Sequence, residues 1–106
     1  MMNPNSAMNI ENMKTLVNVY GNNSGLNWAR FNSCQAWVSE LVYNSAFNVM
    51  FRLVKSYNTI VGFINVDTAE YIELGKWSRT TSKQVTQIHN QLFRNFERKF
   101  IDMYNY

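Results

Sequence analysis

The chain has 106 residues, a length typical of one domain with one hydrophobic core. Its apolar fraction of 46% excludes an intrinsically disordered chain. The single cysteine excludes an intramolecular disulfide, and no apolar run approaches the roughly 20 residues that cross a bilayer. The N-terminal residues show neither a basic nor an apolar signal region. We therefore expect a cytoplasmic protein with no membrane span.

The net charge of +3 is concentrated in the C-terminal third of the chain. Residues 76–106 carry six basic and two acidic side chains, whereas residues 1–75 carry four basic and five acidic ones. Such asymmetry indicates a phosphate-rich or acidic partner, but an ordinary solvated helix face has the same composition. Both interpretations stay open from the sequence.

The N-terminal part of the chain predicts an arm followed by a strand. Residues 1–12 are polar and rich in Asn, without an apolar period, so we expect a flexible arm before a single domain at 13–106. The run at 14–20 favours a strand, and the Gly and Asn residues at 21–25 favour a turn after it. A short extended piece at 27–31 is expected to pair back on that strand.

Two helices are predicted from apolar stripes at helical spacing. The first is short, at about 33–43, with Asn32 or Ser33 as its N-cap. The second is long and C-terminal, at about 81–103, with Thr80 or Thr81 as its N-cap. Its stripe and flank consist of Val85, Ile88, Leu92, Phe93, Phe96, Phe100 and Met103. Because this surface exceeds what one small sheet covers, a homodimer is an open alternative.

Three strands are predicted between the two helices. Residues 46–56 alternate between two faces, residues 59–66 are apolar enough for the middle of a sheet, and residues 71–74 return beside them. Residues 57–58 and 67–70 are turn candidates. The expected fold class is therefore α+β, with a small antiparallel sheet of about four to five strands.

The sequence offers few groups for catalysis or for metal binding. A structural zinc site needs about four Cys or His ligands, and this chain has one of each. Cys34 and His89 are a conceivable nucleophile and base, but Cys34 lies on an apolar stripe, where a buried thiol is expected. The carboxylates are scattered, and no glycine-rich phosphate loop is present. We predict a noncatalytic protein without cofactor or metal.

The start of the last predicted helix is the most informative segment. Residues 77–83 combine four hydroxyl groups with two cations, and a helix N-terminus favours phosphate or carboxylate there. The same hydroxyls also serve as ordinary helix caps. Exposed aromatic rings and the later arginines would extend such a site toward nucleic acid. The predicted partner-binding residues are Tyr57, Trp77, Arg79, Lys83, Arg94 and Arg98.

Two short motifs resemble a family of short uncharacterised phage and prophage proteins. That family pairs a Ser-Tyr-x-Thr-x-Val strand with a Ser-x-Thr-Thr element that leads into a helix containing His. Here the motifs read Ser56-Tyr57-Asn58-Thr59-Ile60-Val61 and Ser78-Arg79-Thr80-Thr81, with His89 downstream. The resemblance covers roughly residues 46–93 and supplies no catalytic residue.

The resemblance implies a phage-encoded protein that acts in the cytoplasm of the host cell. Many small proteins of this class evade host defence by binding and blocking host machinery, as anti-CRISPR inhibitors do. The first hypothesis is therefore a noncatalytic inhibitor that binds a host protein, such as a nucleic-acid-guided nuclease. The alternative is a small nucleic-acid-binding protein that uses the basic C-terminal helix directly.

Overall fold

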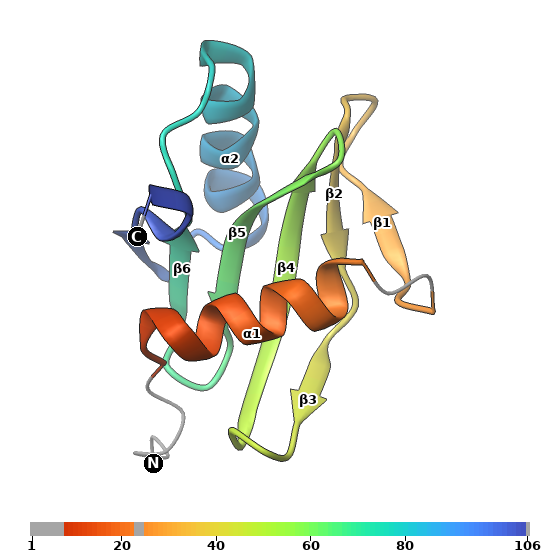
Figure 1. The fold of residues 1–106 in the computed structure, drawn as a ribbon. Helices are drawn as coiled ribbons and strands as arrows, with labels where there is room; N and C mark the ends of the chain where they lie inside the picture. The colour runs from red at the N-terminus through yellow and green to blue at the C-terminus, as the bar shows by residue number, and fades with distance from the viewer. Residues whose placement is uncertain (1–7, 23–24, 106) are drawn as a thin grey trace.

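The computed structural model describes residues 8–22 and 25–105, which form two helices and one seven-stranded mixed sheet (Figure 1). A short 3-10 helix, Met103–Asn105, closes the described chain. The elements in chain order are α1 (Ile10–Gly21), β1 (Trp28–Arg30), β2 (Ala36–Ser39), β3 (Val42–Asn44), β4 (Val49–Ser56), β5 (Thr59–Asn65), β6 (Glu70–Glu73), α2 (Arg79–Leu92) and β7 (Glu97–Phe100).

The sheet runs in the order β1-β2-β4-β5-β6-β7, and β3 pairs with β4 beyond the end of β2. Neighbouring strands are antiparallel except β6 and β7, which are parallel and are connected through α2. Helix α1 crosses one face of the sheet, and α2 lies on the other (Figure 1). The predicted antiparallel sheet of four to five strands is therefore wrong, because the sheet has seven strands and contains the parallel pair β6–β7.

Each face of the sheet has its own core cluster. On the α1 side, Met13 and Leu16 pack with Phe51 and Phe63, and all four are fully buried. On the α2 side, Val85 and Ile88 pack with strand residues such as Val54, Ile64 and Tyr71. Alternate residues of the central strands serve the two clusters, as the two-residue period of a strand requires.

The segment at 14–20 is helical, so the predicted strand there is wrong. Asn9 caps α1, because its side-chain oxygen accepts a hydrogen bond from the Asn12 backbone N–H at 2.8 Å. Met13, Leu16 and Val17 are buried at the three- and four-residue spacing of one helix face. Residues 10–12 belong to the first turn of α1, and residues 1–7 of the predicted arm lie outside the described residues.

The predicted helix at 33–43 is two strands, β2 and β3. Ala36 and Val38 are buried on the α2 side, and Trp37 between them is directed to the other side. Asn32 has φ 52°, a left-handed conformation that Asn tolerates, in the turn that joins β1 to β2. The predicted extended piece at 27–31 contains β1, but it pairs with β2 and not with residues 14–20.

The predicted meander is confirmed as β4, β5 and β6. β4 pairs with β5 from Phe51 opposite Asn65 to Ser56 opposite Thr59, and β5 pairs with β6 in antiparallel register. The turn between β4 and β5 is at residues 57–58, as the sequence predicts. This part of the chain forms the centre of the sheet.

Helix α2 ends at Leu92, so the predicted long helix at 81–103 is wrong beyond that residue. Ser78 is its N-cap and accepts a hydrogen bond from the Thr81 backbone N–H at 3.3 Å. The chain then returns as β7 beside β6, and Met103 is buried in the α1-side cluster. The aromatic flank from which a homodimer is expected therefore lies partly outside the helix.

Buried polar contacts fix α2 on the sheet. The Tyr71 hydroxyl donates to the Val85 carbonyl at 2.7 Å, and burial raises the pKa of Tyr71. The Ser56 hydroxyl, 3% exposed, donates to Gln84 Oε1 at 2.7 Å and lies 3.2 Å from Thr81 Oγ1. A buried polar group without a hydrogen-bond partner lowers the stability of the fold. These contacts therefore hold α2 in one position on the sheet.

An ion pair between Glu70 and Lys99 joins β6 to β7. Burial acts to raise the pKa of Glu70, but hydrogen bonds from Lys99 and Thr68 outweigh it and leave that pKa lowered. The same hydrogen bond to Glu70 raises the pKa of Lys99. A carboxylate whose folded pKa is lowered stabilises the fold above its unfolded pKa, and this contribution is lost as the pH falls through the folded pKa.

We expect Glu70→Gln to lower the free energy of unfolding at about pH 7 and to change it less at the lowest pH at which the protein stays folded, because the wild-type carboxyl becomes protonated as the pH falls through its lowered folded pKa. Partial exposure of both side chains keeps the loss small. Urea unfolding at the two pH values measures it. An equal loss at both pH values would mean that the side chain acts through packing and not through charge.

Candidate functional site

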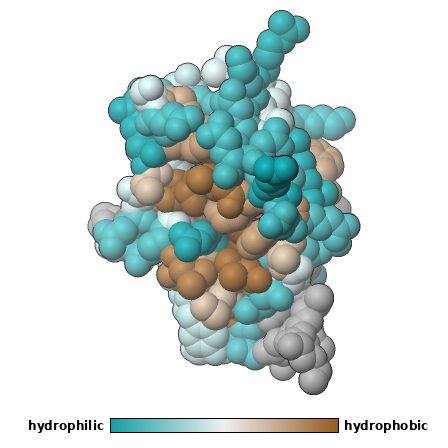
Figure 2. Space-filling view, turned by 180° about the vertical axis from the view of Figure 1, so that it is seen from behind, coloured by the Kyte–Doolittle hydropathy of each residue, from teal (hydrophilic) through white to brown (hydrophobic). Residues whose placement is uncertain are grey.

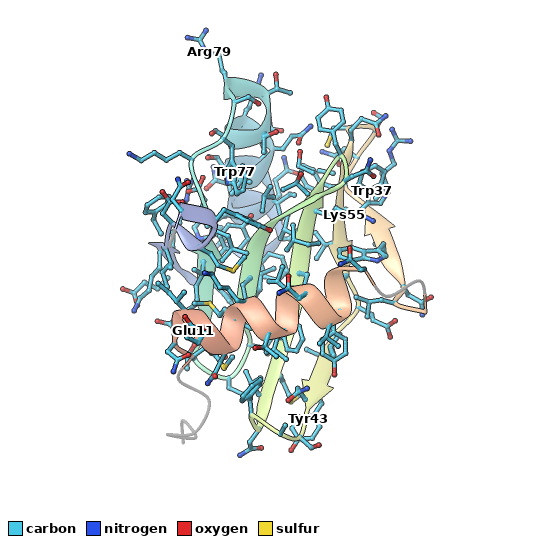
Figure 3. The ribbon with its side chains drawn as sticks, viewed as in Figure 1. Glu11, Trp37, Tyr43, Lys55, Trp77 and Arg79 are labelled. Atoms are coloured by element: carbon cyan, nitrogen blue, oxygen red, sulfur yellow. The ribbon has the colours of Figure 1, made fainter. Side chains whose placement is uncertain are left out.

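The structure does not bring the six predicted partner-binding residues together. Tyr57 is 54% exposed in the β4–β5 turn, with φ 54°. Arg79 and Lys83 are exposed on the first turns of α2, and Figure 3 shows Arg79 directed away from the molecule. Arg94 is exposed after the end of α2. Trp77 and Arg98 are held by internal contacts.

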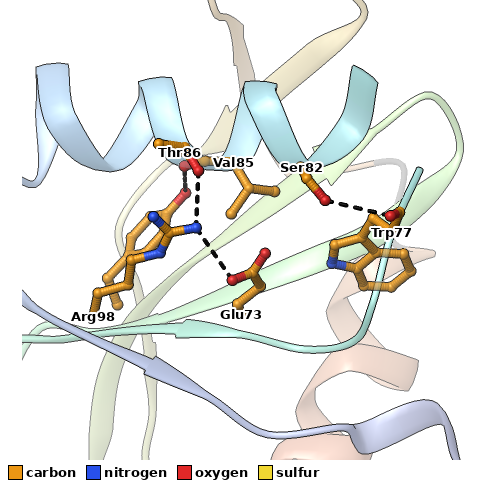
Figure 4. A network of polar contacts seen from close by, with 7 residues as sticks. Glu73, Trp77, Ser82, Val85, Thr86 and Arg98 are labelled. Carbon is orange, nitrogen blue, oxygen red and sulfur yellow. Dashed lines mark hydrogen bonds and ion pairs between the residues drawn. The ribbon is translucent and has the colours of Figure 1, made fainter. Parts of the chain in front are cut away.

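Trp77 and Arg98 have structural partners (Figure 4). The Arg98 Nη2 atom donates to Thr86 Oγ1 at 2.9 Å and to Glu73 Oε2 at 3.3 Å, which links β7 to α2 and β6. The Trp77 carbonyl accepts from the Ser82 hydroxyl at 3.3 Å. The Trp77 ring meets Tyr104 edge to face, with ring centroids 5.7 Å apart. These two residues therefore contribute to the fold.

Cys34 and His89 are each engaged with a backbone carbonyl. The Cys34 thiol lies 3.0 Å from the Phe31 oxygen, and His89 Nε2 lies 2.8 Å from the Phe96 oxygen. The His89 ring also lies against Tyr71, with centroids 5.0 Å apart. Within residues 8–22 and 25–105, no group of three or more Cys, His, Asp or Glu side chains is placed to hold a metal ion.

Four side chains, Trp28, Arg30, Trp37 and Lys55, form a row on the α1 side of strands β1, β2 and β4, named here the aromatic–basic row. Arg30 is opposite Trp37, and Trp37 is opposite Lys55. The Lys55 ammonium lies 4.3 Å from the Trp28 ring centroid and 5.4 Å from that of Trp37. Figure 3 shows Trp37 and Lys55 at the same end of the sheet. Such contacts stabilise a sheet edge and leave indole surface beside two cations.

A β-bulge lies between β2 and β3, the two successive strands that pair with the same edge of β4. Between the pairs Val38–Val54 and Val42–Phe51, residues 39–41 stand opposite only residues 52–53. Ser39, 1% exposed, compensates for the irregular pairing: its hydroxyl accepts from the Leu53 N–H at 2.8 Å. The same hydroxyl donates to the Glu40 carbonyl at 2.9 Å. The sequence gives no direct signal of this bulge.

A groove of about 470 Å³ opens at the bulge, on the α2 side of the sheet. Figure 2 shows that side, where hydrophobic surface gathers in the middle of the face between hydrophilic areas. This volume lies within the range typical of ligand pockets. The groove is lined by Asn27, Trp28, Ala29, Val38, Ser39, Glu40, Arg52, Leu92 and Phe93.

The groove combines apolar surface with one cation and one anion. Leu92, the last residue of α2, is 55% exposed. Arg52 Nη1 donates to the Ser39 carbonyl at 3.3 Å. The Glu40 carboxylate accepts from the Asn27 N–H at 2.6 Å. Sequence reasoning missed this site, because residues 33–43 are predicted as a helix and Leu92 as a core residue.

A model of a family of unknown function, DUF8033, matches residues 8–103. No curated protein and no solved structure matches the chain. Within the described residues, neither helix has the length and apolar character needed to cross a membrane.

Proposed function

The chain belongs to DUF8033, a family of unknown function, and from this premise we propose that it is a noncatalytic protein that binds a host protein through the groove. The observation that carries the proposal is Leu92, a large apolar side chain that is 55% exposed at the wall of an open groove. Surfaces that recognise proteins place apolar side chains beside a few oriented polar groups. The groove has this composition.

The distribution of cations favours a protein partner over nucleic acid. The alternative of a basic C-terminal helix keeps Arg79 and Lys83 on α2, but Arg98 and Lys99 lie on β7 and are paired with Glu73 and Glu70. Phosphate binding draws on several unpaired cations, and a strong binder contacts about six to ten phosphates. An apolar groove is better suited to side chains of a protein segment.

The resemblance to phage and prophage proteins supports a finer version of the proposal. A phage-encoded protein of this size would act in the host cytoplasm by occupying a functional surface of a defence protein, as anti-CRISPR inhibitors block a nucleic-acid-guided nuclease. Such an inhibitor needs shape and complementary contacts, not bond-making groups. A homodimer stays a prediction that a measurement of the molecular mass in solution tests.

The test compares two aspartate substitutions at helix ends. Leu92→Asp places a charge in the groove, whereas Val19→Asp places one on α1, where Val19 is 56% exposed on the other side of the sheet. The two parent side chains are matched in exposure and in position near the end of a helix. Affinity-tagged wild type and both variants are used to recover proteins from a lysate of bacterial host cells, after circular dichroism has shown equal folding.

We expect one protein to be recovered with the wild type and with Val19→Asp, and to fall by roughly tenfold or more with Leu92→Asp, because a charge would be buried against apolar atoms. Recovery that is equal with all three proteins, or that is lost with Val19→Asp alone, would refute binding through the groove.

The second candidate is single-stranded nucleic acid, and the aromatic–basic row is the observation that favours it. Indole rings beside lysine and arginine are the groups that stack bases and neutralise phosphates. Titration of a fluorescent oligonucleotide at about 50 mM and about 200 mM salt tests it, since phosphate contacts weaken steeply over that range. Salt-sensitive binding that Trp37→Ala removes would support this candidate, and no binding at the lower salt would eliminate it.

A further inference from the structure

Arg52 gives the groove a chemical preference. We infer that the groove binds a protein segment that places a carboxylate next to an apolar side chain, with the Arg52 guanidinium receiving the carboxylate. The inference rests on the proposed function and narrows it to one kind of partner segment. It is carried by the position, hydrogen bonding and charge environment of Arg52.

The Arg52 guanidinium has donors left for a ligand. A guanidinium carries five N–H groups, and in the described residues the side chain of Arg52 makes one hydrogen bond, from Nη1 to the Ser39 carbonyl at 3.3 Å. No carboxylate of the described residues lies within ion-pair distance of it. A partly buried cation with open donors at the wall of a groove favours an anionic ligand group.

The bulge orients this cation. On β4, Arg52 is opposite Ile64 of β5, on the face where Ile64 and Val54 belong to the α2-side cluster. The bond to the Ser39 carbonyl holds one edge of the guanidinium against the bulge, and Ser39 is itself fixed by the Leu53 N–H. A guanidinium held at one edge presents its remaining donors in a fixed plane, which matches the two oxygens of a carboxylate.

Glu40 limits the charge that the groove accepts. Its carboxylate also lines the groove and accepts from the Asn27 N–H, and among the described residues it forms no ion pair with Arg52. One cation beside one anion favours a ligand group with a single negative charge over a doubly charged phosphate. Leu92 and Phe93 also line the groove and provide apolar surface for a side chain next to that group. Both features together describe an acidic residue flanked by a large apolar one.

The experiment is a selection from a library of random peptides seven residues long, displayed with both ends blocked by the carrier. The wild type, Arg52→Gln, Leu92→Asp and Glu40→Gln are used as separate baits after their folding has been verified by NMR. Wild-type selection should enrich Asp or Glu next to Leu or Phe. A synthetic peptide from that set should bind Arg52→Gln roughly ten- to a hundredfold more weakly, as expected for a lost charge-assisted hydrogen bond. Arg52→Lys should restore only part of the affinity, because lysine lacks the planar fork.

The affinity of Glu40→Gln for the same peptide tests the charge of Arg52 separately from any structural role of that side chain. This variant lacks a negative charge in the groove, so it should bind the same acidic peptide at least as tightly as the wild type. If the selected peptides fail to bind Leu92→Asp but carry no acidic residue, the inference is overturned and the proposed function stands. If no peptide depends on Leu92, the proposed function fails together with the inference.

Discussion

Replacing Phe51 with alanine should lower the free energy of unfolding by about 3–5 kcal/mol, which is a large part of the roughly 5–15 kcal/mol that a domain of this size has. Phe51 is fully buried at the centre of β4. Its ring stacks on Phe63 with centroids 5.0 Å apart, and it meets the Tyr20 ring of α1 edge to face at 5.4 Å. Removal of the ring leaves a cavity between α1 and the sheet. Urea unfolding followed by tryptophan fluorescence measures the loss.

Phe100→Ala is the matched control for this prediction, because it removes the same ring from a surface strand. Phe100 is 49% exposed on β7, and surface substitutions of this kind usually change stability by about 0.5 kcal/mol or less. The two variants should therefore differ by several kcal/mol. If Phe51→Ala were no more destabilised than Phe100→Ala, α1 would not pack on β4 as described.

The central strands were predictable because their local pattern and their environment agree. Residues 49–56 alternate between the two faces of the sheet, and residues 60–65 are buried throughout, as a strand covered on both sides must be. Two-residue alternation has no helical interpretation over that length. The sequence therefore predicts this meander and the turn at 57–58 correctly.

The two wrong assignments in the N-terminal half have a common cause. Residues 14–20 are rich in β-favouring side chains, yet Met13, Leu16 and Val17 also satisfy a helix face, and the Asn9 cap and the core on the sheet decide for the helix. Residues 33–43 show the reverse ambiguity. Their apolar residues fit a helical stripe, but Ala36 and Val38 find their burial by pairing beside β4.

The C-terminal third shows why a long apolar stripe is not a long helix. Val85 and Ile88 do belong to one buried face of α2. Met103 belongs to the cluster on the opposite side of the sheet, so the chain has to leave the helix to reach it. The spacing of apolar residues along the chain does not indicate which side of a sheet each of them will reach. That missing information also hid the groove, because its residues come from β1, β2, the bulge, β4 and the end of α2.

Ser39→Ala should lower the free energy of unfolding by about 1–3 kcal/mol, the cost of leaving a buried donor without a partner. The Ser39 hydroxyl is the acceptor for the Leu53 N–H at 2.8 Å, at a point where the bulge has displaced the regular strand pairing. Alanine cannot accept this bond, and water has no access to a side chain that is 1% exposed. Hydrogen exchange of the Leu53 amide should accelerate together with the loss in stability. Ser45→Ala, at an exposed turn position, is the control and should change neither quantity. A protected Leu53 amide in Ser39→Ala would show that the bulge is held by other contacts, and the orientation of Arg52 would then need another cause.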